Sequence, residues 1–178
     1  KKGFALIVQH SITEQSSESE VQMLTTLQAI SEIDIPAVLI HPNNDAGSIG
    51  IQNALESINS TNIHIKRNVD RESYANLMKY AKFMIGNSSS GLLEAPTFEL
   101  PAINIGRRQI GRLQAENVVN VDFDKGKIKD VIYYVMNDKG FLSNLETIEN
   151  PYGDGHSSKR IVGILENIEI DSNLLNKE

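Results

Sequence analysis

A short apolar run that breaks into glycine and serine constrains the fold of this chain most. Residues 83–85 are apolar, and Gly86 and Gly91 flank a polar turn with three consecutive serines. We interpret this stretch as a strand, a tight turn and the start of a helix, because the glycines relax the backbone around the serines. Free backbone N–H groups, hydroxyl donors and the positive end of a helix dipole would then converge, which suits an anion.

Glu94 follows the serines at a distance that helix capping does not require. Any of Ser88, Ser89 and Ser90 could cap the helix. The reciprocal capping position lies three residues later, at residues 91–93, so Glu94 is free for another role. A carboxylate one to two turns into a helix that binds phosphate can accept hydrogen bonds from both hydroxyls of a ribose. The alternative is that the serines only cap a helix and that Glu94 is solvated.

Five runs rich in apolar residues, and one segment in which Ile63 and Ile65 alternate with polar residues, lie between segments of helical spacing along the chain. Continuous runs are typical of strands that are buried on both faces of a parallel sheet. The expected strands are residues 4–8, 37–40, 62–66, 83–85, 101–105 and 117–121. Helical spacing predicts helices at about 18–32 and 125–138, with a last helix around Ile161, Ile164 and Leu165. This alternation predicts an α/β fold with a doubly wound, Rossmann-like parallel sheet, in one domain over residues 1–178.

Polar and charged residues follow the expected strands. Ligands of doubly wound sheets lie beyond the carboxyl ends of the strands. The candidate loops are therefore residues 10–13, 41–48, 67–70, 86–91 and 106–112. The last of these loops concentrates positive charge in Arg107, Arg108 and Arg112. We expect one functional site where these loops meet.

Composition excludes several classes of protein. The net charge of −6, from 17 basic and 23 acidic residues, argues against a nucleic-acid partner. No apolar run approaches the roughly 20 residues of a membrane span, and the absence of cysteine excludes disulfides and thiolate metal sites. We expect a cytoplasmic protein without a membrane partner. The first residue is not methionine, which we take to indicate a piece of a longer chain.

Four motifs connect the chain to a known family. They are residues 86–96, 103–112, 42–48 and 151–155. In order and spacing they resemble the UDP-N-acetylglucosamine 2-epimerase family, most closely its hydrolysing branch in sialic acid and related nonulosonate synthesis. The resemblance covers most of the chain.

The resemblance implies the C-terminal half of a GT-B-type enzyme with two Rossmann-like halves. The family's chemistry eliminates UDP from a UDP-amino sugar through a glycal-like intermediate and then adds water, which releases N-acetylmannosamine. Its acid and base carboxylates lie on the N-terminal half, so this chain alone is expected to be inactive. The implied partners are UDP, the UDP-amino sugar and the missing N-terminal domain, and no cofactor or metal is implied.

Four site residues follow from the serine and arginine motifs of the family. Carried over by position, Ser88 and Ser89 would hold the diphosphate together with turn amides. Glu94 would accept hydrogen bonds from the ribose hydroxyls, and Arg108 would lie near the phosphates.

Three further residues follow from the other strand ends. The resemblance implies that Asn43 lines the nucleotide site and that the backbone around Val69 recognises uracil. His10 would face the diphosphate and the sugar as a cationic or donating imidazole that supports the departing UDP. Ser11 stands where the family usually has proline, which is expected to leave this loop more flexible.

Two other functions share the predicted fold. A GT-B glycosyltransferase would transfer the sugar to an acceptor, and a non-catalytic sensor would bind the nucleotide sugar alone. An NAD-binding function is disfavoured, because no Gly-x-Gly-x-x-Gly motif follows the first strand. The sequence leaves open which UDP-amino sugar is bound and whether the protein forms a homo-oligomer.

Overall fold

Six short strands form one parallel sheet. The computed structural model describes residues 3–58 and 61–176. The strands are β1 (Ala5–Val8), β2 (Ala37–Ile40), β3 (Ile63–Lys66), β4 (Phe83–Gly86), β5 (Ala102–Ile105) and β6 (Val118–Val121). Their order is β3-β2-β1-β4-β5-β6, and every neighbouring pair is parallel. The strand order reverses between β1 and β4, which confirms the doubly wound sheet and puts its switch point there.

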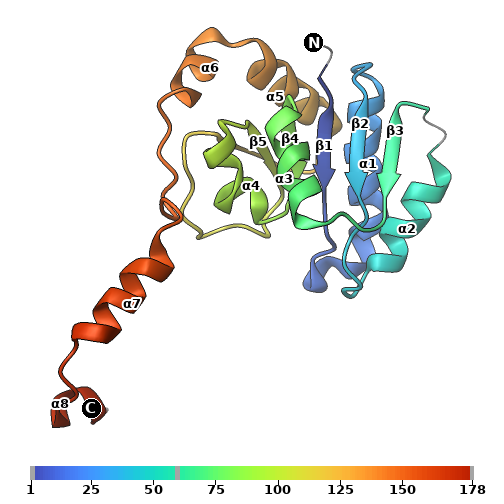
Figure 1. Cartoon of the computed structure of the whole chain (residues 1–178). Helices are drawn as coiled ribbons and strands as arrows, with labels where there is room; N and C mark the ends of the chain where they lie inside the picture. Colours follow the sequence, from blue (N-terminus) through green and yellow to red (C-terminus); the bar gives the residue numbers. More distant parts are fainter. Residues whose placement is uncertain (1–2, 59–60, 177–178) are drawn as a thin grey trace.

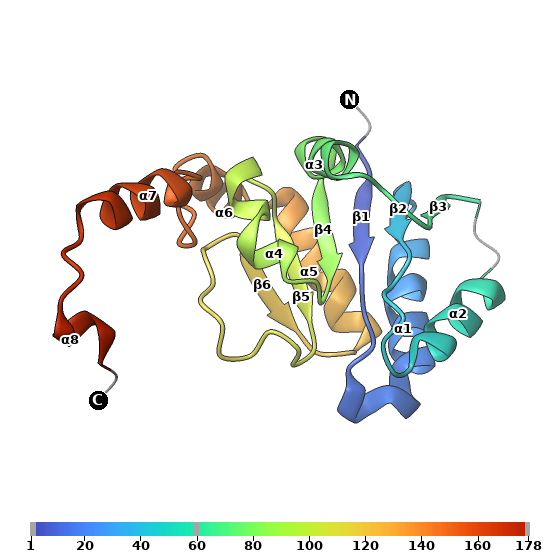
Figure 2. The same ribbon diagram turned by 60° about the horizontal axis from the view of Figure 1, so that its bottom comes forward.

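Helices cover both faces of the sheet (Figures 1 and 2). One face carries α1 (Ser19–Ser31), α2 (Ser48–Ser57) and α5 (Lys125–Asn137). The other face carries α3 (Arg71–Tyr80), α4 (Ser90–Leu93) and the 3-10 helix η2 (Ala95–Phe98). The remaining elements are η1 (Thr13–Glu18), α6 (Lys139–Leu145), α7 (Ser157–Asn167) and α8 (Ser172–Leu175). Among the described helices, none is both long and apolar enough to cross a membrane.

The sheet separates two hydrophobic cores, because side chains of a strand point alternately to its two faces. In β1, Ala5 and Ile7 join the core beneath α1, whereas Leu6 and Val8 join the core beneath α3. Burial on both faces explains the continuous apolar runs in the sequence. The helices predicted at residues 18–32 and 125–138 are confirmed, within one residue, as α1 and α5.

The helix after the serine turn is shorter than predicted. α4 ends at Leu93, and Glu94 connects it to η2. Pro96 explains the early end, because it has no N–H to donate to the Leu92 carbonyl and disfavours helical geometry in the residue before it. The prediction that Glu94 lies one to two turns inside a helix is therefore wrong. Its side chain projects from the junction between α4 and η2.

The C-terminal helices extend away from the sheet in both views (Figures 1 and 2). α7 confirms the predicted last helix, but none of its residues is buried. Ile161, Ile164 and Leu165 are 56%, 61% and 65% exposed. Beyond α7, the C-terminal tail contains α8, which Asp171 caps by accepting a hydrogen bond from the Leu174 N–H at 2.9 Å. Residues 177–178 of that tail lie outside the described residues.

Gly86 is expected to tolerate no side chain. Its φ is +134°, and a Cβ atom would overlap the carbonyl oxygen of Val8, which accepts hydrogen bonds from two turn N–H groups. Gly86→Ala should lower the free energy of unfolding by about 3 kcal/mol or more, since it adds backbone strain to a clash with backbone atoms. Gly111→Ala is the matched control, because Gly111 has φ +80° but no atom within 4 Å of a Cβ. Urea denaturation measures both losses, and equal losses would contradict a steric role for Gly86.

Candidate functional site

The carboxyl ends of β1 and β4 meet at the switch point of the sheet. Val8 pairs with Gly86, so the segments that follow the two strands leave the sheet side by side. The crevice at such a point is the usual ligand site of a doubly wound sheet. The fold therefore brings His10 next to the serine turn.

Asn87 connects three of the predicted loops. Its fully buried side chain donates from Nδ2 to the His10 carbonyl oxygen at 2.8 Å and accepts at Oδ1 from the His10 N–H at 2.7 Å. Its own carbonyl oxygen accepts from Nη1 of Arg108 at 3.1 Å and from Nε2 of Gln109 at 2.7 Å. Asn87 thereby holds His10 and Arg108 near each other.

Neither Asn87 nor Gln109 is among the residues that the sequence analysis assigns to the site. Both are 0% exposed. The position of Asn87 is the signal that points to it, because a polar side chain directly after a buried strand must find hydrogen-bond partners. Gln109 carries no comparable signal, since it lies in a loop whose path the sequence leaves open.

The imidazole of His10 is half-buried beside the loop of Asn43. The Asn43 N–H lies 3.4 Å from Nδ1, which is therefore the acceptor, and the ring proton lies on Nε2. Burial lowers the pKa of His10, the cation of Arg108 lowers it further, and the carboxylate of Asp45 opposes the shift. Of the two forms that the resemblance allows, the structure favours the neutral imidazole, which donates from Nε2.

The serine turn offers hydroxyl groups but little helix dipole. Ser89 occupies the N-cap position of α4, yet its side chain caps no N–H group. Ser88 Oγ accepts from the Ser90 N–H at 3.3 Å and lies 2.8 Å from Ser90 Oγ. Because α4 has only four residues, the helix dipole predicted for this site is small. The N–H groups of Asn87 and Ser88 donate to the Val8 carbonyl oxygen, so the turn would bind an anion mainly through its hydroxyl groups.

A cavity of about 360 Å³ lies between α3 and the segment from α4 to η2. Glu94 lines it, together with Arg71 and Tyr74 of α3 and with Tyr152 of the fourth sequence motif. Its volume is in the range of small-ligand pockets. Arg71 is a cation that the sequence analysis missed, because the predicted loop ends one residue before it.

Asn150 fixes the C-terminal wall of this cavity. Its Nδ2 donates to the Leu93 carbonyl oxygen at 2.9 Å and to Thr97 Oγ1 at 2.8 Å. The motif at residues 151–155 is thus held against the segment that carries Glu94.

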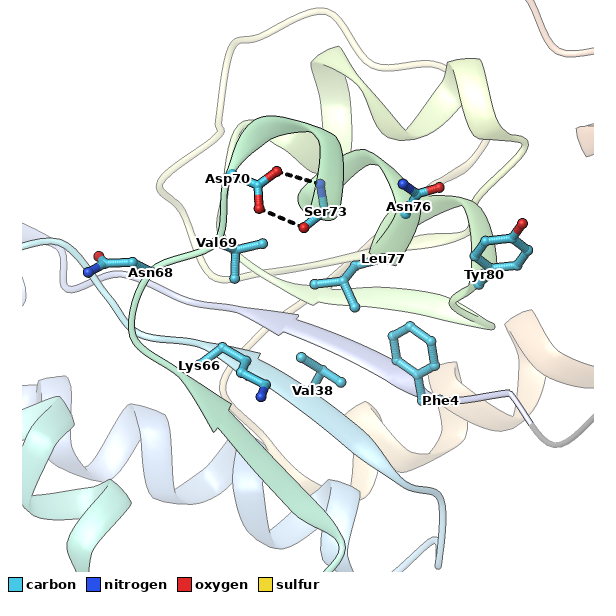
Figure 3. Close-up of a pocket in the computed structure, with 10 residues that line it drawn as sticks. All are labelled: Phe4, Val38, Lys66, Asn68, Val69, Asp70, Ser73, Asn76, Leu77 and Tyr80. Carbon is cyan, nitrogen blue, oxygen red and sulfur yellow. Dashed lines mark hydrogen bonds between the residues drawn. The ribbon is translucent and has the colours of Figure 1, made fainter.

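Val69 lies two residues before α3. Asp70 caps that helix by accepting hydrogen bonds from the N–H and the hydroxyl of Ser73, at 2.9 Å and 2.6 Å (Figure 3). Within the described residues, the backbone N–H and carbonyl of Val69 hydrogen bond to no other protein group. These groups are available for the uracil contact that the resemblance implies.

An apolar groove of about 480 Å³ runs along the other side of α3 (Figure 3). Phe4, Val38, Leu77 and Tyr80 line it, and Val69 is the one predicted site residue in its wall. Since Tyr74 lines the cavity of Glu94 instead, α3 separates the two hollows.

The predicted site residues fall into three places along the carboxyl edge of the sheet. The first place, around Asn87, holds His10, Asn43 and Arg108. The second, the serine turn, holds Ser88 and Ser89. The third consists of the two sides of α3, with Glu94 on one side and Val69 on the other. Residues 3–58 and 61–176 contain no group of three or more His, Asp or Glu side chains that could hold a metal ion.

His10 is expected to titrate below its ordinary pKa of 6.5. Arg108→Gln removes a neighbouring cation and should raise the pKa of His10, whereas Asp45→Asn removes the opposing carboxylate and should lower it further. NMR shifts of the His10 ring protons against pH measure the pKa of His10 in the unchanged chain and in the two variants. Shifts of the same sign in both variants would contradict the geometry around His10.

Comparison with known proteins identifies relatives over most of the chain. A family model described as UDP-N-acetylglucosamine 2-epimerase matches residues 1–166. The chain is 28% identical to the UDP-N,N'-diacetylbacillosamine 2-epimerase (hydrolyzing) of Legionella pneumophila over 177 residues, 99% of this chain and 46% of that protein. It is 33% identical to the GDP/UDP-N,N'-diacetylbacillosamine 2-epimerase (hydrolyzing) of Campylobacter jejuni over 127 residues, 69% of this chain and 33% of that protein.

A solved structure has the same fold. The UDP-GlcNAc 2-epimerase from Neisseria meningitidis bound to UDP-GlcNAc matches with a TM-score of 0.76 and 19% identity, over 93% of this chain and 45% of that chain. The chain therefore spans less than half of each of the three proteins and has the fold of one Rossmann-like half of a GT-B-type enzyme. Because the family model matches 166 of the 178 residues, the chain belongs to the UDP-N-acetylglucosamine 2-epimerase family.

Proposed function

We propose that residues 1–178 form the UDP-binding, C-terminal half of a hydrolysing UDP-N-acetylglucosamine 2-epimerase. The observation that carries this proposal is the meeting of His10, Arg108 and the serine turn around Asn87. The names of the Legionella pneumophila and Campylobacter jejuni relatives, which are hydrolysing 2-epimerases, support the hydrolysing reaction. The products would be UDP and either N-acetylmannosamine or its diacetamido analogue. The reaction would take place in the cytoplasm.

The proposed nucleotide pose follows the carboxyl edge of the sheet. The diphosphate contacts Ser88, Ser89 and Arg108. Hydrogen bonds from these groups to the phosphate oxygens are stronger than those between neutral groups, because the acceptor is charged. The ribose enters the cavity of Glu94, and the backbone of Val69 recognises uracil. Asn43 lines the same site through the loop that contacts His10.

The proposed reaction begins with elimination. A base on the remainder of the protein removes the proton from C2 of the sugar, the bond between C1 and the UDP oxygen breaks, and a glycal remains. Water then adds across C1 and C2, with the hydroxyl group on C1 and the proton delivered to the opposite face of C2. This chain supports the departing diphosphate, whose negative charge meets Arg108, the turn hydroxyls and Nε2–H of His10 as it develops.

The acid and base carboxylates are proposed to lie outside this chain, so residues 1–178 alone would be inactive. The chain spans less than half of the relatives that it matches. The exposed apolar side of α7 supports a contact with the remainder of the protein, because Ile161, Ile164 and Leu165 project into solvent. Such apolar patches commonly mark interaction surfaces.

Titration of the 178-residue chain with UDP tests the placement of the nucleotide site. UDP should bind in preference to ADP and NAD without added metal, because the proposed contacts recognise uracil and diphosphate together. Calorimetry measures all three affinities. Binding only by the complete protein would show that the other half completes the site, whereas no UDP binding by either would refute the proposal.

Product analysis of the complete protein separates the proposed enzyme from its alternatives. Incubated with UDP-N-acetylglucosamine and no acceptor, a hydrolysing epimerase releases N-acetylmannosamine and UDP. A glycosyltransferase would need an acceptor, and a sensor would release neither product. Carbohydrate analysis with the diacetamido substrate then identifies the preferred sugar.

Glu94→Gln is expected to weaken UDP binding by about 2 kcal/mol, roughly 30-fold, because hydrogen bonds to a charged acceptor contribute this much. Calorimetry with UDP and with 2',3'-dideoxy-UDP measures the effect. The dideoxy nucleotide has no ribose hydroxyls to donate, so its affinity should not change. Glu99→Gln, at an exposed position after η2, is the matched control. An equal loss for both nucleotides would remove the proposed role of Glu94.

A further inference from the structure

Three hydroxyl groups from three segments form a continuous chain beside the serine turn. Tyr74 Oη on α3 lies 2.6 Å from Ser90 Oγ on α4, and Ser90 Oγ lies 2.8 Å from Ser88 Oγ in the turn. The middle member, Ser90, is buried. The chain therefore runs from the wall of the Glu94 cavity to the proposed diphosphate contact.

Each hydroxyl has one proton to donate, so the three hydroxyls can form this chain in two directions only. Burial raises the pKa of the Tyr74 phenol, so Tyr74 keeps its proton at neutral pH. Its oxygen lies 2.6 Å from Ser90 Oγ, and the Ser88 hydroxyl interacts with it as well. If Tyr74 donates to Ser90, then Ser90 is free to donate to Ser88. The other acceptor near Ser90 is the Met84 sulfur at 3.8 Å, which is weaker.

Ser88 Oγ then accepts two hydrogen bonds. One comes from the Ser90 hydroxyl, and the other comes from the Ser90 N–H at 3.3 Å. With its lone pairs occupied in this way, Ser88 has only its proton to offer to a ligand. The reverse direction would turn a lone pair of Ser88 toward the anion, which is repulsive.

We propose that Tyr74 is a positioning residue that fixes Ser88 as a hydrogen-bond donor to a phosphate oxygen of the nucleoside diphosphate. This inference rests on the proposed function, which places the diphosphate at the serine turn. An isolated serine can turn either its proton or a lone pair toward a ligand. The hydroxyl chain limits this freedom to two concerted arrangements, of which one presents a donor to the anion, so less ordering is needed on binding. Hydrogen bonds in such a chain also strengthen one another.

A double-mutant cycle tests the coupling between Tyr74 and Ser88. UDP affinity is measured by calorimetry in the complete protein with Tyr74→Phe, Ser88→Ala and both changes together. Ser88→Ala should weaken UDP binding by about tenfold and Tyr74→Phe by several-fold, on the scale of hydrogen bonds to an anion. The double variant should bind UDP no more weakly than Ser88→Ala, because Tyr74 acts only through Ser88.

Two controls separate positioning from folding. Uridine has no phosphate, so none of these variants should change its affinity, and a loss of uridine binding would reveal a damaged fold. Tyr133→Phe removes a phenol hydroxyl at an exposed position on α5, away from the proposed site, and UDP affinity should not change. Ser90→Ala interrupts the chain at its middle and should reproduce the coupled loss even if Tyr74→Phe folds poorly.

The outcomes distinguish this inference from the proposed function. If Ser88→Ala weakens UDP binding but the losses from Tyr74→Phe and Ser88→Ala multiply, Tyr74 acts independently and the positioning role is wrong. An unchanged affinity in Tyr74→Phe would likewise overturn it. If Ser88→Ala itself leaves UDP affinity unchanged, the diphosphate does not lie at this turn, and the proposed pose fails together with the inference.

Discussion

The buried side-chain amide of Asn87 forms hydrogen bonds with both the backbone N–H and the backbone carbonyl of His10. His10 lies just beyond the end of β1, where the sheet no longer provides backbone hydrogen bonds. Because Asn87 is fully buried, breaking either hydrogen bond would leave a desolvated polar group, which costs about 1–3 kcal/mol. Its carbonyl oxygen also accepts from Arg108 and Gln109. One residue therefore sets the positions of the loops that follow β1, β4 and β5, and the candidate site depends on it.

The groups that this contact assembles are mostly neutral donors. The pKa of His10 is lowered by burial and by Arg108, and the hydroxyls of Ser88 and Ser89 carry no charge. Neutral donors can be held in place without the large desolvation cost of buried cations. Arg108 is exposed and supplies positive charge, and its Nη1 donates one hydrogen bond to the Asn87 carbonyl oxygen. Such an arrangement would stabilise the negative charge that develops on the departing diphosphate in the proposed reaction.

The sequence predicts the sheet well, because each strand can be recognised from its own residues. A strand that is buried on both faces must be apolar throughout, as in residues 4–8. It also predicts that polar loops gather at one edge, which places His10, Ser88 and Arg108 correctly as neighbours. The length of α4 and the junction at Glu94 depend on Pro96, whose effect outweighs the helical pattern. Contacts such as that of Gln109 with Asn87 depend on the path of a loop, which no local pattern encodes.

Helix α3 links proposed contacts that would lie far apart on a nucleotide. Its first residues follow Val69, whose free backbone groups are proposed to meet the base. Tyr74, one turn later, lines the cavity of Glu94 and also begins the hydroxyl chain that ends at Ser88. A displacement of α3 would therefore change the proposed base, ribose and phosphate contacts at once. Because the phosphate contact passes through two further hydroxyls, the helix can affect the orientation of a donor that it does not itself carry.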